Sequence, residues 1–376
     1  MKKIILVISL LIYVIMFQEI EVFAEEDTTQ SIMDSIDFYG IDESLEELLK
    51  GQDLNFQDMV VKIMKGDLSL KDGNLGSILL NSLFSGALSY KDSFIHIILI
   101  VIIAAIFTNF SNIFKSTQIA EVSFYIIYLL LFTVLITSFK EMAGVVTQAL
   151  DTLLTFMKVL VPAYFLAIAF STGGTTAMMF YEFTFLMITV VQWLLLHVVI
   201  PAVNMYVTLT LVNHISKEDF LSKLADLMKK SVKWMLKSMF AAVVGINVIQ
   251  GLIAPAIDAV KSMAITKTAS SLPGIGNALN AMTELVLGSA VLIKNSIGVA
   301  ALIVILLLCA APVVKLAVSS FLYHVIEAVL QPISEKRMLE CIHGVGEGIG
   351  LLLKVLTMAA VLFLVTIAMI SVSTSR

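Results

Sequence analysis

The chain has few charged residues and almost no cysteine. Only 14% of its 376 residues are charged, whereas 59% are apolar and the mean hydropathy is +0.97. Soluble domains have about 45–50% apolar and about 25% charged residues, so a soluble globular protein with one core is excluded. The two cysteines, Cys309 and Cys341, lie far from the acidic N-terminal segment, which has none. We therefore expect no structural disulfide.

Sequence motifs of common enzymes are also missing. The chain has no HExxH metal helix, no Walker phosphate loop and no GxSxG nucleophile turn. His324 and Glu327 share a helical face, but two ligands without a third make a weak metal site. The glycine-rich run 344–350 has the wrong spacing for a dinucleotide site, and we interpret it as letting the last helix begin close to its neighbours. We expect no catalysis and no cofactor or metal.

Long apolar runs recur from Ser93 to the C-terminus. Most have about 20 residues, enough to cross a hydrocarbon core of roughly 30 Å. Strand alternation is absent, and helices satisfy their backbone polar groups internally in lipid. We predict an all-α, polytopic membrane protein with about six to eight membrane segments and a small exported helical N-terminal segment. The apolar segments are 94–114, 122–139, 159–181, 183–212, 239–257, 297–314 and 350–370.

The N-terminus predicts export. Residues 1–24 resemble a signal peptide with a basic start and a small-residue end, the alternative being a retained first span. Residues 25–92 carry 14 acidic residues against 5 lysines, whereas residues 93–376 carry 17 basic against 13 acidic residues. This asymmetry fits the positive-inside tendency and argues against nucleic-acid binding. Within this acidic segment, two short amphipathic helices are expected at residues 45–49 and 60–64, each followed by a glycine.

A basic amphipathic stretch lies between two apolar segments, at residues 217–237. We predict an interfacial helix on the cytoplasmic membrane surface, the alternative being a solvated loop helix. Its lysines are Lys217, Lys223, Lys229, Lys230, Lys233 and Lys237.

The apolar segment 159–181 is broken in its middle by Ser, Thr and Gly. An exported N-terminus and a cytoplasmic basic helix need an odd number of crossings, yet four apolar stretches lie between them. One stretch therefore does not cross, and two short pieces joined by Gly and Thr favour a re-entrant hairpin or broken helix. The alternative is a tight turn between two ordinary spans. The candidate conduit residues are Pro162, Gly173, Gly174, Thr175, Thr176 and the carboxylate Glu182.

An internal repeat of residues 160–257 and 271–372 is a further prediction. Pro162 and Pro201 are 39 residues apart, as are Pro273 and Pro312. Such a repeat would be parallel and would place both basic loops on the cytoplasmic face.

Several short motifs resemble those of the stage III sporulation protein AE family of endospore-forming bacteria. They are Gly66-Asp67-Leu68-Ser69-Leu70, Pro162-Ala163-Tyr164-Phe165, Gly173-Gly174-Thr175-Thr176, Leu272-Pro273-Gly274-Ile275-Gly276, Val286-Leu287-Gly288-Ser289, Lys294-Asn295-Ser296-Ile297-Gly298 and Gln331-Pro332-Ile333-Ser334. Each is short, but their order and spacing extend over nearly the whole mature chain.

The resemblance implies a multi-pass component of the sporulation channel complex that links mother cell and forespore. It would lie in the mother-cell membrane around the forespore, with its exported segment among the other stage III sporulation complex proteins. Its core would act as a conduit or permease-like element required for forespore development. The alternative is a non-conducting scaffold that assembles other complex members.

Overall fold

The computed structural model describes residues 26–49, 54–66, 117–172, 174–215, 219–269, 276–332 and 334–373, with a few positions between 95 and 106. Throughout these residues the regular elements are helices, which confirms the predicted all-α class. The predicted signal peptide, the apolar segment 94–114 for the larger part, Gly173 and Lys217 lie outside the described residues.

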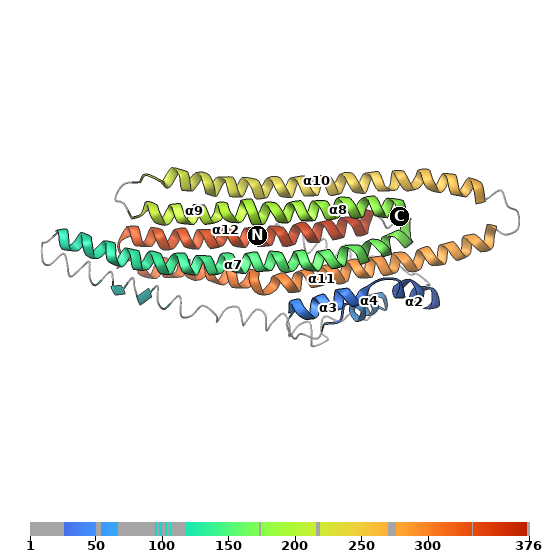
Figure 1. Ribbon diagram of the computed structural model, residues 1–376, viewed down its shortest axis with the longest axis horizontal. Coiled ribbons are helices and arrows are strands. Elements are labelled where there is room, and N and C mark those ends of the chain that lie inside the picture. The colour runs from blue at the N-terminus through green and yellow to red at the C-terminus, as the bar shows by residue number, and fades with distance from the viewer. Residues whose placement is uncertain are drawn as a thin grey trace.

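Long helices lie side by side along the long axis of the molecule (Figure 1). They are α7 (Thr117–Thr172), α8 (Gly174–Leu194), α9 (Ile200–Asn213), α10 (Ser222–Ala269), α11 (Gly276–Leu330) and α12 (Lys336–Ser373), and a short π-helical turn, η1 (Leu195–Val199), joins α8 to α9. At 1.5 Å per residue, α7 is about 84 Å long, far more than a hydrocarbon core of about 30 Å. Helix α7 therefore extends well beyond the bilayer core.

Five helical stretches in the described part are long and apolar enough to cross a membrane. They are Phe124–Ser171, Tyr181–Asn213, Ser222–Gln250, Val286–Leu330 and Lys336–Ser371. The protein is therefore a multi-span membrane protein, as the composition predicts.

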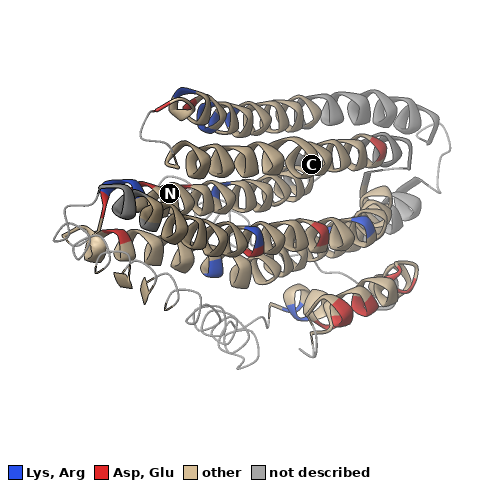
Figure 2. Cartoon of the chain, turned by 60° about the vertical axis from the view of Figure 1, so that its left-hand side comes forward, with Lys and Arg blue, Asp and Glu red and all other residues tan. Residues whose placement is uncertain are grey.

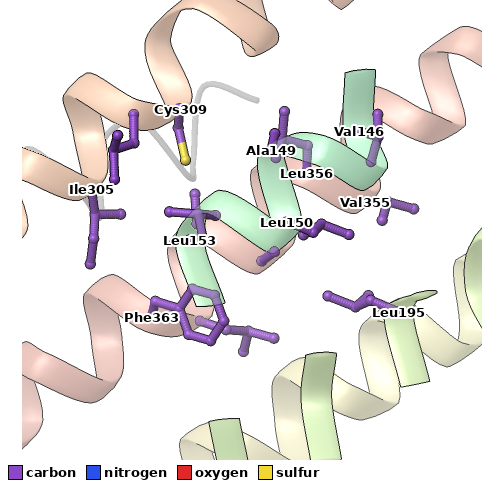
Figure 3. Packing of buried hydrophobic residues seen from close by; sticks show 14 of the residues in the cluster. Val146, Ala149, Leu150, Leu153, Leu195, Ile305, Cys309, Val355, Leu356 and Phe363 are labelled. Atoms are coloured by element: carbon purple, nitrogen blue, oxygen red, sulfur yellow. The ribbon is translucent and has the colours of Figure 1, made fainter. Parts of the chain in front are cut away.

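Helix α12 occupies the centre of the bundle, where α7, α9, α10 and α11 all contact it. Its side chains Val355, Leu356 and Phe363 are buried against other helices (Figure 3). The same cluster contains Leu150 of α7 and Ile305 of α11. Close apolar packing across four neighbouring helices thus holds α12 in place.

The break in the apolar segment 159–181 falls where the sequence predicts it, since α7 ends at Thr172 and α8 begins at Gly174. The flanking pieces are not short, however, because Pro162 lies inside the 56-residue α7. The described residues on either side form two long helices, α7 and α8, that pack on each other. The re-entrant hairpin and its alternative, a turn between two spans, stay predictions. Glycine marks a place where a helix can end. Residues 140–158 pack on α11 and α12, and this packing keeps the helix continuous through Pro162.

Three short helices cover one side of the bundle: α2 (Glu26–Asp34), α3 (Phe38–Leu49) and α4 (Phe56–Met64). Helix α3 packs on α7, whereas α2 and α4 pack on α11. Phe56 is fully buried, and its ring centroid lies 6.4 Å from that of Phe156 in α7. The Asn55 side chain caps α4 by accepting from the Asp58 amide at 2.7 Å, and Gly66 just after this helix has φ +71°. The amphipathic helices predicted near residues 45–49 and 60–64 are confirmed.

Helix α9 ends at Asn213 and α10 begins at Ser222, whereas α11 ends at Leu330 and α12 begins at Lys336. These four helix ends lie at the same end of the bundle (Figure 1). His214 and Glu340 bring the first and the last of them together with an N–O distance of 2.8 Å. The internal repeat itself stays a prediction.

Candidate functional site: a charged layer on the first half of α12

Glycines on α12 bring α9 and α11 close to its backbone. A Cβ added at Gly344 or at Gly348 would lie under 3.0 Å from Thr210 or from Val207 of α9. One added at Gly346 would lie 2.9 Å from Nδ1 of His324 in α11. The interpretation of the glycine run as a close-packing device is therefore confirmed.

An ion pair lies in this closely packed region. Lys229 of α10 pairs with Glu347 of α12, and both side chains are largely covered, with relative exposures of 24% and 30%. The Lys229 ammonium also lies 5.8 Å from the ring centroid of Tyr206 in α9. Lys354, about two turns further along α12, interacts electrostatically with Glu347, Lys229 and Lys233. Three helices therefore contribute ionisable or polar groups to one layer of the bundle. We name Lys229, Glu347, Tyr206 and Lys354 the charged layer.

Two histidines, one on α12 and one on α11, lie next to the charged layer. His343 of α12 lies 2.8 Å from a carboxylate oxygen of Glu327 in α11, and its ring stacks on that of His324 at 5.6 Å between centroids. The pair His324 and Glu327 thus gains a third neighbour that the sequence did not indicate. Even so, no three His, Cys, Asp or Glu side chains in the described residues are arranged to hold a metal ion.

An arginine in the first turn of α12 also contacts another helix. The Arg337 guanidinium donates two hydrogen bonds, of 2.6 and 3.0 Å, to Glu335 and lies 3.7 Å from the ring centroid of Phe124. Nearby, the Tyr128 hydroxyl donates to the Leu211 carbonyl and contacts Cys341 Sγ at 2.8 Å. These contacts tie α7, α9 and α12 together beyond the charged layer.

The predicted basic residues are part of α10, with Lys217 outside the described residues. Lys229 points to Glu347, whereas Lys223, Lys230, Lys233 and Lys237 are exposed. The same helix continues into the apolar segment at 239–257, so residues 222–237 are not a separate element. Glu347 and His343 were not singled out as functional residues, although an acid inside a glycine-rich run was a usable signal.

The predicted conduit residues lie at the other end of the bundle (Figure 1). Pro162 is exposed on α7, and Glu182 is exposed on α8. Gly174, Thr175 and Thr176 form the first turn of α8. The structure therefore does not bring these residues near the charged layer.

Comparison with known proteins identifies the family. Residues 54–374 match the family described as stage III sporulation protein AE. The chain belongs to this family. It is 21% identical over 313 residues to the "Stage III sporulation protein AE" of Bacillus subtilis (strain 168), covering 83% of this chain and 78% of that relative. No solved structure matches. The resemblance deduced from the short motifs is confirmed, and the chain is a membrane protein of a sporulation family.

Proposed function

We propose that this protein is the membrane component of a channel complex that links mother cell and forespore and is required for forespore development. It lies in the mother-cell membrane around the forespore, with its N-terminal segment exported toward the other complex members. Its core acts as a conduit or permease-like element and carries out no catalysis. Family membership and the apolar helices support this proposal.

The paired charges Lys229 and Glu347 are the observation that carries the conduit part of the proposal. Lys229 and Glu347 belong to two stretches that are long and apolar enough to cross a membrane, Ser222–Gln250 and Lys336–Ser371. Ionisable residues within such stretches are costly and usually occur where a substrate or ion passes. A passive anchor needs no such pair, because apolar side chains of similar volume often pack as well or better. Retaining both charges beside Tyr206 therefore points to a polar function of this layer.

A non-conducting scaffold is the second candidate. It is favoured by the glycine contacts of α12, which produce a closely packed bundle, and by the acidic outer side of α3. Glu43, Glu46 and Glu47 are exposed there, so this side is available to a basic partner.

A neutral, similarly sized pair separates the two candidates. The double variant Lys229→Met with Glu347→Gln removes both charges but keeps the side-chain volume. For a conduit, we expect normal membrane levels and co-purification with other complex proteins, but loss of spore yield. The matched control is Lys230→Met with Lys237→Gln, which changes two exposed lysines of the same helix.

Full spore yield from the neutral pair would contradict the conduit. Loss of co-purification together with spore yield would favour the scaffold. Gly174→Leu, at the start of α8, tests the sequence-based conduit region in the same assays. Spore yield should be lost, because transport fails, whereas co-purification with other complex proteins should be kept.

A further inference from the structure

The outward face of α7 is polar over a length similar to the bilayer core. Between Thr133 and Lys158, every exposed residue of α7 is polar or glycine. These residues are Thr133, Thr137, Lys140, Glu141, Gly144, Gln148, Asp151, Thr155 and Lys158. The section from Thr137 to Lys158, which we name the α7 stripe, is about 32 Å long at 1.5 Å per residue. It thus matches a hydrocarbon core of about 30 Å.

The opposite side of the same helical turns lies in the middle of the apolar bundle. Leu150 and Leu153 of α7 lie in one buried cluster with Leu195 of η1, Ile305 of α11 and Val355 of α12 (Figure 3). The last three residues belong to, or begin, stretches without any Asp, Glu, Lys or Arg: 183–213, 295–314 and 355–375. The middle of the α7 stripe, around Leu150 and Leu153, is therefore at the depth where these three stretches are free of charge.

Exposure of the α7 stripe to lipid would be energetically costly. Asp or Lys at the bilayer centre costs about 2.5–3.5 kcal/mol. Asp151 lies between Leu150 and Leu153 at this depth, and the stripe carries three further charged residues toward its ends. By contrast, α8 exposes Phe183, Leu186, Val190 and Trp193, which suit acyl chains. Charged positions accordingly occur along the middle of the bundle as well as at its end (Figure 2). One side of the molecule faces lipid, and the α7 side faces water or protein.

Helix α3 lies near the C-terminal end of the α7 stripe. It packs on α7, and Phe56, at the start of the following helix α4, contacts Phe156 within the length of the stripe. Its exposed outer residues include Glu46 and Glu47. The acidic N-terminal segment therefore lies against α7 near the C-terminal end of the stripe.

The spacing of the stripe fits a neighbouring helix that crosses α7 at a small angle. Positions 137, 141, 144, 148, 151, 155 and 158 alternate by four and three residues, the 3.5-residue period of two helices that cross at a small angle. Copies inserted into one membrane share their direction, so α7 of one copy can run parallel to α7 of another. Gly144, where an added Cβ would meet no described atom within 4 Å, allows close approach.

We propose that two copies of this chain face each other through their α7 stripes and enclose a polar, hydrated seam at membrane depth. Lys140 and Glu141 bring both signs of charge to one depth, so each copy offers the other a partner of opposite sign. Asp151 meets Asp151 of the other copy, and this repulsion keeps water between the helices there. The proposal goes beyond the proposed function, because a scaffold could pair in the same way.

Single cysteines on the stripe test the pairing in membranes of sporulating cells. Gln148→Cys, Asp151→Cys and Thr155→Cys are compared with Leu186→Cys and Val190→Cys on the lipid-facing side of α8. The native chain is the baseline, because Cys309 and Cys341 are buried. Each membrane sample is oxidised with copper phenanthroline, or labelled with a charged thiol reagent, and analysed by blot.

We expect the stripe variants to form a disulfide-linked dimer and to react with the charged reagent, and the α8 variants to do neither. Labelling without a dimer would overturn the second copy as the occupant. A stripe that neither labels nor forms a dimer, or α8 variants that form dimers equally well, would overturn the whole inference. Gln148→Cys and Thr155→Cys remove no charge, so they remain informative if Asp151→Cys does not accumulate. The dimer is read independently of spore yield, so it distinguishes this inference from the conduit.

Discussion

Replacement of Gly348 by alanine tests whether close packing around α12 stabilises the bundle. The added Cβ would lie under 3.0 Å from Val207 of α9 and 3.1 Å from the Phe139 ring of α7. Val207 is β-branched and has one strongly preferred rotamer in a helix, so it cannot simply turn away. Overpacking of this kind costs about 1–3 kcal/mol, of which the better helix propensity of alanine returns up to about 1 kcal/mol. We expect a net loss of about 1–2 kcal/mol.

The assay is thermal unfolding of the detergent-solubilised protein, followed by tryptophan fluorescence. The unfolding midpoint of Gly348→Ala should fall by about 1–3 °C. Gly245→Ala in α10 is the matched control, because its Cβ would meet no described atom within 4 Å, and its midpoint should stay or rise. Adding Val207→Ala to Gly348→Ala should recover part of the loss. If Gly348→Ala behaved like Gly245→Ala, the close contact would not be part of the folded bundle.

Two further substitutions test contacts outside the glycine line. Arg337→Lys keeps the charge but loses the planar stacking on Phe124 and the two hydrogen bonds to Glu335, so the same unfolding assay should show a loss of about 1–2 kcal/mol; an unchanged midpoint would refute this. Burial raises the pKa of the Asp42 carboxyl, which accepts from the Phe56 amide. Its folded pKa is therefore above its unfolded value, so stability falls as pH rises through that range. Hydrogen exchange of α4 should become faster with that rise beyond the intrinsic rate, and Asp42→Asn should remove this excess.

Local patterns in the sequence were sufficient for several features of the fold. The apolar runs predicted an all-helical membrane protein, and Gly174 marked where one long helix gives way to the next. Helix extents were not predictable in the same way. Residues 140–158 carry charge, which separated two apolar segments in the sequence. In the structure their inner side packs on α11 and α12, so one helix passes through both segments.

The charged layer shows the same division. Lys229 was recognised as part of a basic stretch, but its partner Glu347 lies 118 residues away in the sequence, on a different helix. The pairing of His343 with Glu327 likewise joins two helices. Periodicity relates residues within one helix, so it could not show which side chains of two helices meet.

Composition, apolar run length and short motifs determined by themselves that this is a helical membrane protein of a sporulation family. These properties depend on transfer of side chains to lipid and on local backbone preferences, both of which act within a segment. Tertiary structure alone decided that α12 is central, that its glycines contact α9 and α11, and that α7 turns a polar side outward. Such features depend on contacts between residues far apart in the chain, where shape and charge of whole helices select one packing arrangement.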